Sequence, residues 1–135
     1  MAEELDGETP AFARQVFDLA REGKTQQLIE YVDAELPVNL TNTAGDTLLL
    51  LAAYYDHPDT VAALLDRGAD PNRVNDRGQT ALVAAVFRRS EPSVRALLAA
   101  GADPTAGDPD ALDTAVFFDL PEMAALLRSD PAPNG

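Results

Sequence analysis

Few residues of this chain are suited to chemistry. It has a single histidine, His57, and no cysteine, so it offers no thiolate nucleophile, disulfide or thiolate metal ligand. His57 directly precedes Pro58, at a predicted turn between two helices. A histidine there is more often held by a turn hydrogen bond than used as a general base or a metal ligand. We therefore expect no catalytic role for His57.

The carboxylates and one lysine are the remaining candidates. Clustered oxygen ligands suit calcium, but the aspartates of the C-terminal third lack the spacing of a calcium-binding loop. Gly23-Lys24-Thr25 is preceded by no glycine at the spacing of a phosphate-binding loop. We predict no catalytic residue, no cofactor and no metal site, including at Asp103, Asp108, Asp110 and Asp113.

Composition indicates one soluble domain. The chain has 135 residues, of which 46% are hydrophobic and 24% charged. Its first residues are acidic and lack the pattern of a signal peptide, and its apolar runs fall short of the roughly 20 residues of a membrane-spanning helix. A net charge of −13 argues against direct binding to nucleic acids or anionic membranes. We expect a cytoplasmic protein that is a monomer on its own.

The elements that position these residues repeat at one fixed offset along the chain. The offset that carries Gly45 onto Gly78 also carries Thr47 onto Thr80. The tetrapeptide at 68–71, Gly-Ala-Asp-Pro, falls on an identical one at 101–104. This offset lies within the range of roughly 20–50 residues that indicates a stacked array of repeated units.

Each period predicts two short helices and a connecting finger. The first helix, "DTLLLLAAYY" or "QTALVAAVF", follows a polar turn, and the second, "PDTVAALLDRG" or "EPSVRALLAAG", has proline in its first turn and Asp59 or Ser93 near its cap. The segment "ADPNRVNDRG" is predicted to be an extended, hairpin-like finger. Glycines are expected where the backbone needs a positive φ, before the first helix and after the second, at Gly45, Gly78, Gly68 and Gly101.

These motifs resemble the ankyrin-repeat family. The family pattern of D-x-x-G-x-T-P-L-H, A-A, V-x-x-L-L and G-A-D-x-N is matched by "NTAGDTLLLLAA…VAALLDRGADPN" and "NDRGQTALVAA…VRALLAAGADP". Leu48 and Ala81 replace the usual proline, and Leu50 and Val83 replace the usual histidine, which removes familiar turn and hydrogen-bond supports. The resemblance implies an all-α fold, an ankyrin-repeat solenoid of about four helix-turn-helix repeats joined by β-hairpin-like fingers.

The resemblance covers roughly residues 10–128. The last finger is expected to be four residues shorter, because Leu127 follows Gly101 more closely than Leu98 follows Gly68. The terminal segments 1–9 and 129–135 are predicted to be disordered. The predicted units are a cap repeat at 10–40, repeats at 41–73 and 74–106, and a short C-terminal cap repeat at 107–128.

The resemblance also implies where a partner binds. In the family, the two residues after the paired alanines commonly face the concave groove, and here five of those eight places are aromatic. An open alternative is that one aromatic of each pair packs in the core. The predicted partner contacts are Tyr54, Tyr55, Phe87, Arg88, Phe117 and Phe118, with a polar rim of the finger-tip residues Thr43, Asp46, Asp76, Arg77 and Gln79.

We therefore predict a non-catalytic protein–protein interaction module, regulatory or adaptor in role, that binds a protein partner through its groove and finger tips. The alternative is an acidic mimic or inhibitor that occupies a cationic site on its partner, with strongly salt-dependent affinity. A third class, a binder of small molecules or metals, would reveal itself by a ligand-induced rise in melting temperature.

Overall fold

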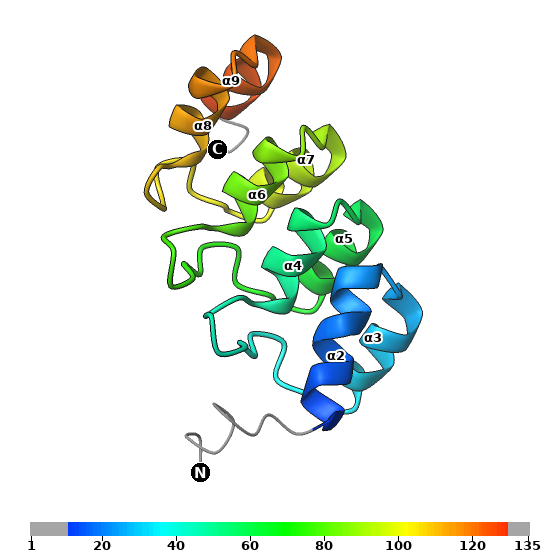
Figure 1. Ribbon diagram of the computed structural model, residues 1–135. Helices are drawn as coiled ribbons and strands as arrows, with labels where there is room; N and C mark the ends of the chain where they lie inside the picture. The colour runs from blue at the N-terminus through cyan, green and yellow to red at the C-terminus, as the bar shows by residue number, and fades with distance from the viewer. Residues whose placement is uncertain (1–10, 130–135) are drawn as a thin grey trace.

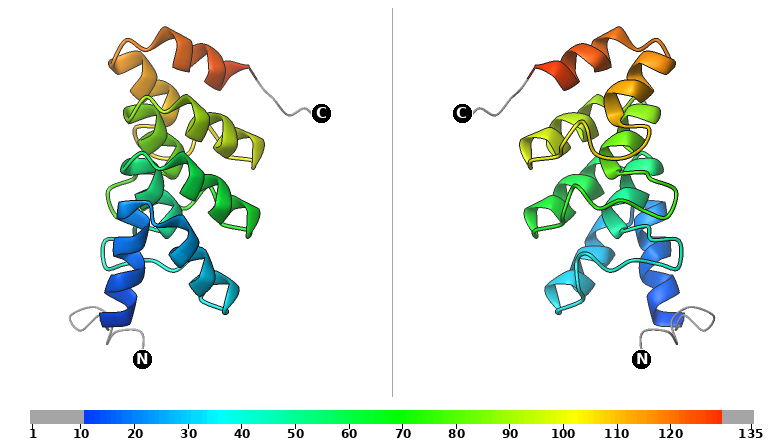
Figure 2. Two further views of the ribbon diagram at one scale, coloured as in Figure 1. Left: turned by 90° about the vertical axis from the view of Figure 1, so that its right-hand side faces the viewer. Right: turned by 90° about the vertical axis from the view of Figure 1, so that its left-hand side faces the viewer.

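The computed structural model describes residues 11–129, which form helix-turn-helix pairs stacked in chain order (Figure 1). The first helices of the pairs contact one another in one layer, and the second helices form another (Figure 2). This architecture confirms the predicted all-α fold. The pairs are α2 (Ala11–Glu22) with α3 (Thr25–Asp33), α4 (Leu48–Tyr54) with α5 (Pro58–Asp66), α6 (Ala81–Phe87) with α7 (Glu91–Ala99), and α8 (Ala111–Phe117) with α9 (Pro121–Arg128).

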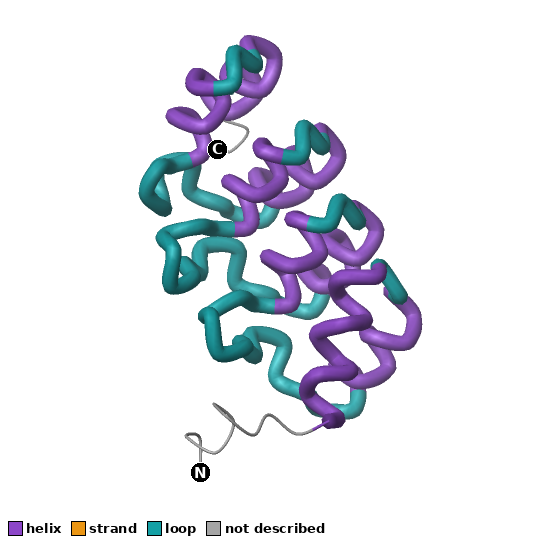
Figure 3. The backbone as a smooth tube through the Cα atoms, viewed as in Figure 1, coloured by secondary structure: helices purple, strands orange, loops and turns teal. Residues whose placement is uncertain are grey.

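The fingers between the pairs lie along one side of the stack (Figure 3). Within the described part of the chain they contain isolated β-bridges, Thr41 with Thr47 and Gly107 with Asp110, and no regular strand. The fingers are thus less regular than true β-hairpins. The predicted disorder of 1–9 and 129–135 lies outside the described residues, apart from Ser129 at the end of α9.

Helix positions correct the predicted length of the last finger. The first helices α4, α6 and α8 begin at Leu48, Ala81 and Ala111. The interval from Ala81 to Ala111 is three residues shorter than the interval from Leu48 to Ala81. The finger is therefore three residues shorter and not four. The prediction matched Leu127 with Leu98, whereas both Leu127 and Leu97 are the seventh residue of their helices.

Local sequence signals explain where the helices start and stop. The hydroxyls of Thr47 and Thr80 cap α4 and α6 by accepting from the backbone N–H groups three residues ahead, at 3.0 and 3.1 Å. For α7 the cap is Ser90, whose hydroxyl accepts from the N–H of Ser93, so Ser93 lies near the cap, in the first turn, as predicted. The four glycines expected to have positive φ all have it, between 79° and 96°.

One apolar core runs the length of the stack. The small Ala52 and Ala85 are fully buried where first helices pack together. Leu50 and Val83, which stand where the family usually has histidine, are also buried. Burial of each apolar side chain contributes roughly 1.5–3 kcal/mol to stability, in place of a polar contact. No helix among residues 11–129 is long and apolar enough to cross a membrane.

Candidate protein-binding surface

Five aromatic side chains lie in contact across the last three helix pairs. The rings of Tyr54 and Phe87 are parallel, with centroids 6.2 Å apart, and the rings of Phe87 and Phe118 meet edge to face at 5.6 Å. Tyr55 contacts Tyr54 at 5.2 Å, and Phe117 contacts Phe118 at 4.9 Å. We call this row the aromatic ladder, in the order Tyr55, Tyr54, Phe87, Phe118 and Phe117.

The repeat register creates the ladder. α4, α6 and α8 each have seven residues, and they end on Tyr54, Phe87 and Phe117. The next residue, the C-cap, is Tyr55, Arg88 and Phe118 in turn. Because consecutive first helices pack side by side, equivalent end residues come to lie in a row. The structure thus brings together all six residues that the sequence proposed for the groove.

All five rings of the ladder are exposed, from 38% for Tyr54 to 81% for Phe117. The alternative in which one aromatic of each pair packs in the core does not agree with these values. Ring pairs of this kind contribute roughly 0.5–1.5 kcal/mol each beyond their burial. They hold the side chains in place but leave a contiguous apolar surface in water, and such surfaces commonly mark interaction sites.

Arg88 is the charged member of the same row. Its Cζ atom lies 5.8 Å from the centroid of the Tyr54 ring, in the geometry of a cation–π contact. Arg77, on the finger before α6, donates from Nε and Nη2 to the side-chain oxygen of Gln79 at 3.3 Å. Both guanidinium groups are exposed and accessible to a partner.

The finger tips differ from the predicted rim at one residue. Thr43, Asp76 and Arg77 are exposed and Gln79 is half-buried, but Asp46 is only 7% exposed. Its carboxylate accepts from the side-chain amides of Asn75 at 2.8 Å and Asn42 at 3.3 Å. Asp46 is therefore a structural residue between fingers, and the accessible rim consists of the other four residues.

Two asparagines organise the fingers, and the site prediction omitted them. Oδ1 of Asn42 accepts from the N–H groups of Ala44 and Asp46, at 2.9 and 3.0 Å. Oδ1 of Asn75 does the same for Arg77 and Gln79, both at 2.9 Å. Such side-chain bonds hold a loop in one shape. The signal was present in the sequence, since Asn42 and Asn75 are one period apart.

His57 links the first two helix pairs. Its Nε2 atom donates to the backbone carbonyl of Arg21 at 2.8 Å. Its ring also lies over Gly23, where an added Cβ would come within 2.5 Å of Nδ1. These contacts give His57 a packing role between repeats in place of the simple turn bond that the sequence suggested.

Two aspartates of the last finger accept hydrogen bonds from nearby backbone N–H groups. Asp103 accepts from the hydroxyl of Thr105 at 2.7 Å and from its N–H at 2.9 Å, and these bonds lower the pKa of Asp103. Asp110 caps α8 by accepting from the N–H of Asp113 at 2.8 Å. Among residues 11–129, no three histidine or carboxylate side chains are grouped so that they could hold a metal ion.

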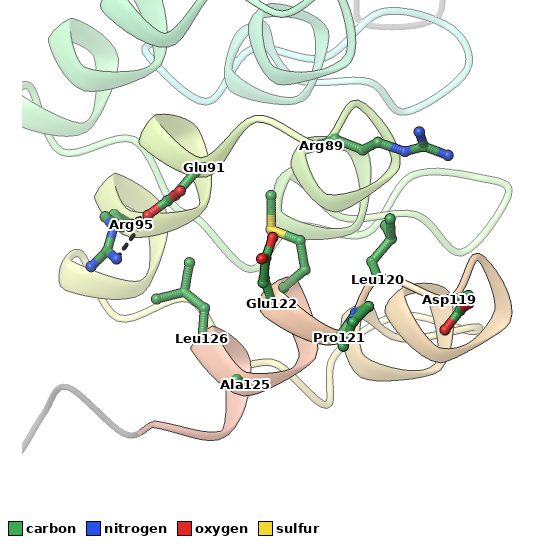
Figure 4. Close-up of a pocket in the computed structure, with 10 residues that line it drawn as sticks. Arg89, Glu91, Arg95, Asp119, Leu120, Pro121, Glu122, Ala125 and Leu126 are labelled. Carbon is green, nitrogen blue, oxygen red and sulfur yellow. Dashed lines mark hydrogen bonds and ion pairs between the residues drawn. The ribbon is translucent and has the colours of Figure 1, made fainter.

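A cleft of about 710 Å³ lies between α7 and α9 (Figure 4). Leu120, Met123 and Leu126 give it an apolar wall, and its charged groups include the ion pair of Arg95 with Glu91 at 2.8 Å. The acidic and basic groups are spread along its edges and do not converge on one point (Figure 4). The cleft belongs to the second helices, whereas the ladder belongs to the first.

Comparisons with known proteins agree with this architecture. The family of ankyrin repeats in three copies matches residues 17–108. An ankyrin repeat protein of Pseudomonas aeruginosa is 53% identical over 58 residues, which are 43% of this chain and 34% of that relative. The crystal structure of the ankyrin repeat domain of human ASB11 is similar with a TM-score of 0.77 and 25% identity, over 87% of this chain and 54% of that one.

The chain thus covers about one third of the bacterial relative and about half of the human domain. The family match extends over more than half of this chain. Repeats of this kind are generally protein–protein interaction modules and are not known as catalysts. The chain belongs to the ankyrin-repeat family.

Proposed function

We propose that this protein binds a protein partner through the aromatic ladder and the finger tips, that it catalyses no reaction, and that its role is regulatory or adaptor. The observation that carries the proposal is the ladder itself, five exposed rings in contact across three repeats. Family membership supports the general function, and the ladder indicates the surface.

The physical character of the ladder suits a binding site. Tyrosine, phenylalanine and arginine supply most of the strong contacts at protein interfaces, since they bury large areas with few rotatable bonds. Contacts between neighbouring rings fix their orientation before a partner arrives, which reduces the entropy lost on binding. The exposed finger-tip residues Thr43, Asp76 and Arg77, with Gln79, would form the polar rim.

The proposal includes a monomeric, cytoplasmic protein without direct contact to nucleic acid or membrane. The alternative is an acidic mimic or inhibitor that occupies a cationic site on its partner, and the net charge of −13 is the observation that favours it. The two mechanisms differ in salt dependence, because affinity that depends on many charge pairs falls steeply as salt rises, while apolar burial is little affected.

Single substitutions on the ladder test the proposal. Tyr54→Asp, Phe87→Asp and Phe117→Asp should each abolish capture of the partner from an extract of cells that express the protein. Their circular dichroism and melting temperature should stay close to wild type, because the side chains are exposed. Phe12→Asp is a matched control, since Phe12 is 48% exposed and lies in α2, away from the ladder.

The control variant should retain the partner. Undiminished capture by all three ladder variants would show that the binding surface lies elsewhere. A loss of helical structure in those variants would instead show that the rings support the fold.

A further inference from the structure

The aromatic ladder offers its largest apolar surface at the C-terminal end. Phe117 is 81% exposed, whereas the equivalent Phe87 and Tyr54 are 44% and 38% exposed. Beside it, Val116 is 61% exposed, although the equivalent Val86 is fully buried where α6 packs on α8. Within residues 11–129 no further helix pair covers α8. An apolar side chain of a partner would therefore bury the most surface at this end.

Two arginines of one middle repeat are available for a charged contact, Arg88 in contact with the ladder and Arg77 on the finger before α6. Arg77 and Arg88 both belong to the repeat of α6 and α7, and in the described chain neither has a carboxylate within ion-pair distance. Among the ion pairs that arginines form elsewhere within residues 11–129 are those of Arg21 with Asp18, Arg67 with Asp33, Arg73 with Asp70, and Arg95 with Glu91.

The position of Arg88 leaves its hydrogen-bond donors free. Arg88 places its Cζ over the Tyr54 ring, and within residues 11–129 its guanidinium group makes no hydrogen bond or ion pair. The N–H donors lie in the plane of the group and point outward from its edge. A carboxylate matches two of them in the bidentate pairing that makes arginine–carboxylate contacts strong. Arg88 is the one cation whose contact to the ladder is seen in the described chain.

The N-terminal end of the same row is charged and less suited to an acidic ligand. The positions equivalent to Tyr54 and Tyr55 are Arg21 and Glu22. Arg21 already donates to Asp18 at 2.8 Å, and Glu22 adds an exposed negative charge. Along the row the surface therefore changes from the charged Arg21 and Glu22, through two exposed tyrosines and the pair of Phe87 with Arg88, to the exposed Phe117 and Phe118 beside Val116.

From this order we infer, given the proposed function, that the partner presents an acidic amphipathic peptide segment. A glutamate or aspartate of that segment accepts hydrogen bonds from Arg88, and a leucine or phenylalanine packs on Phe117 and Phe118. The net charge of −13 does not oppose this contact strongly, since long-range repulsion is screened beyond about 8 Å at physiological salt. Affinity should accordingly hold or rise with moderate salt, opposite to the behaviour of an acidic mimic.

A random peptide library displayed on phage, selected against the immobilised full chain, tests the inference without knowledge of the partner. The selected pool should be enriched in acidic residues together with leucine and aromatic residues, relative to the starting pool. A synthetic peptide from that pool should bind Arg88→Gln about tenfold more weakly than wild type, by fluorescence anisotropy, as loss of one charge-assisted contact predicts. Phe117→Ser should abolish binding, and Phe12→Ser should leave it unchanged.

The outcomes separate this inference from the proposed function. Selected peptides that require Phe117 but are neutral or basic, or that bind Arg88→Gln as well as wild type, would overturn the acidic partner and leave the ladder as the binding surface. A selection that returns no peptide dependent on Phe117 would overturn both. Circular dichroism of each variant confirms that a change in affinity reflects the contact and not the fold.

Discussion

The side-chain amide of Asn75 donates a hydrogen bond of 2.8 Å to the carboxylate of Asp46, and this bond joins two consecutive fingers. Both side chains are buried, at 5% and 7% exposed. A backbone bond from Asp76 to the carbonyl of Ala44, at 3.0 Å, reinforces the connection. Consecutive finger tips are thus held relative to one another by polar contacts, of which the bond of Asn75 with Asp46 is shielded from water.

Asp46→Ala should lower the free energy of unfolding by about 1.5–3 kcal/mol, because it removes a charged acceptor of buried donors. Asn75 would keep its bond to Gln79 at 3.0 Å, which limits the loss. Urea denaturation followed by circular dichroism measures the change. Asp76→Ala, at an exposed finger tip, is the control and should change stability by no more than about 0.5 kcal/mol. Equal effects of the two substitutions would show that the buried bond contributes nothing specific.

The turns inside the helix pairs share a left-handed backbone with different side chains. φ is 71° at Gly23, 65° at Asp56, 59° at Arg89 and 57° at Asp119. A long side chain in this region costs roughly 1–2 kcal/mol relative to glycine, offset in part by the greater freedom of glycine when unfolded. Arg89→Gly should therefore raise the free energy of unfolding by about 0.5–1 kcal/mol, seen as a higher melting temperature.

The opposite change at Gly23 provides the contrast. Its added Cβ would meet the ring of His57 at 2.5 Å, and that ring is held in place by its bond to Arg21. Gly23→Ala should thus lower the melting temperature, and His57→Ala should relieve part of the loss in the double variant.

A melting temperature of Arg89→Gly at or below wild type would show that the left-handed turn stores no strain there.

The repeat could be predicted from sequence because its signals are local. The repeated motifs and the glycines at positive φ can be recognised in short segments, and the same register placed the ladder residues. The burial of Asp46 could not be predicted in this way, since it depends on how one finger lies against the next. Nor does the sequence mark the left-handed turn residues Asp56, Arg89 and Asp119. Of the four equivalent turns, only the first has glycine, at Gly23, which is the residue usual at positive φ.

Below about pH 4 the pair of Arg67 with Asp33 should make stability depend on pH. Nε of Arg67 donates to Asp33 at 2.9 Å, across α3 and α5, and this bond lowers the pKa of Asp33. A carboxylate whose pKa is lowered by folding stabilises the fold above its unfolded pKa and loses this effect as pH falls through the lowered value. Asp33→Asn should therefore flatten the fall of melting temperature in acid.

Both groups of this pair are exposed, so the effect should be small and should shrink in high salt. Arg67→Gln should reproduce the response of Asp33→Asn, and the double variant should add nothing further. A melting temperature that falls in acid as steeply for Asp33→Asn as for wild type would contradict the assignment.

Val86 and Val116 occupy the same position of α6 and α8, and only the first is covered by a following helix. Val86→Ala removes two methyl groups from a fully buried site and should cost about 2 kcal/mol in the free energy of unfolding. Val116→Ala should change it by no more than about 0.5 kcal/mol, because most of that side chain is already in water and alanine favours the helix slightly. Chemical denaturation of both variants at two protein concentrations measures the difference.

A similar loss at Val116 would mean that this face is covered in solution. Dependence of that loss on concentration would identify the cover as a second copy of the chain, which would also contradict the proposed monomer.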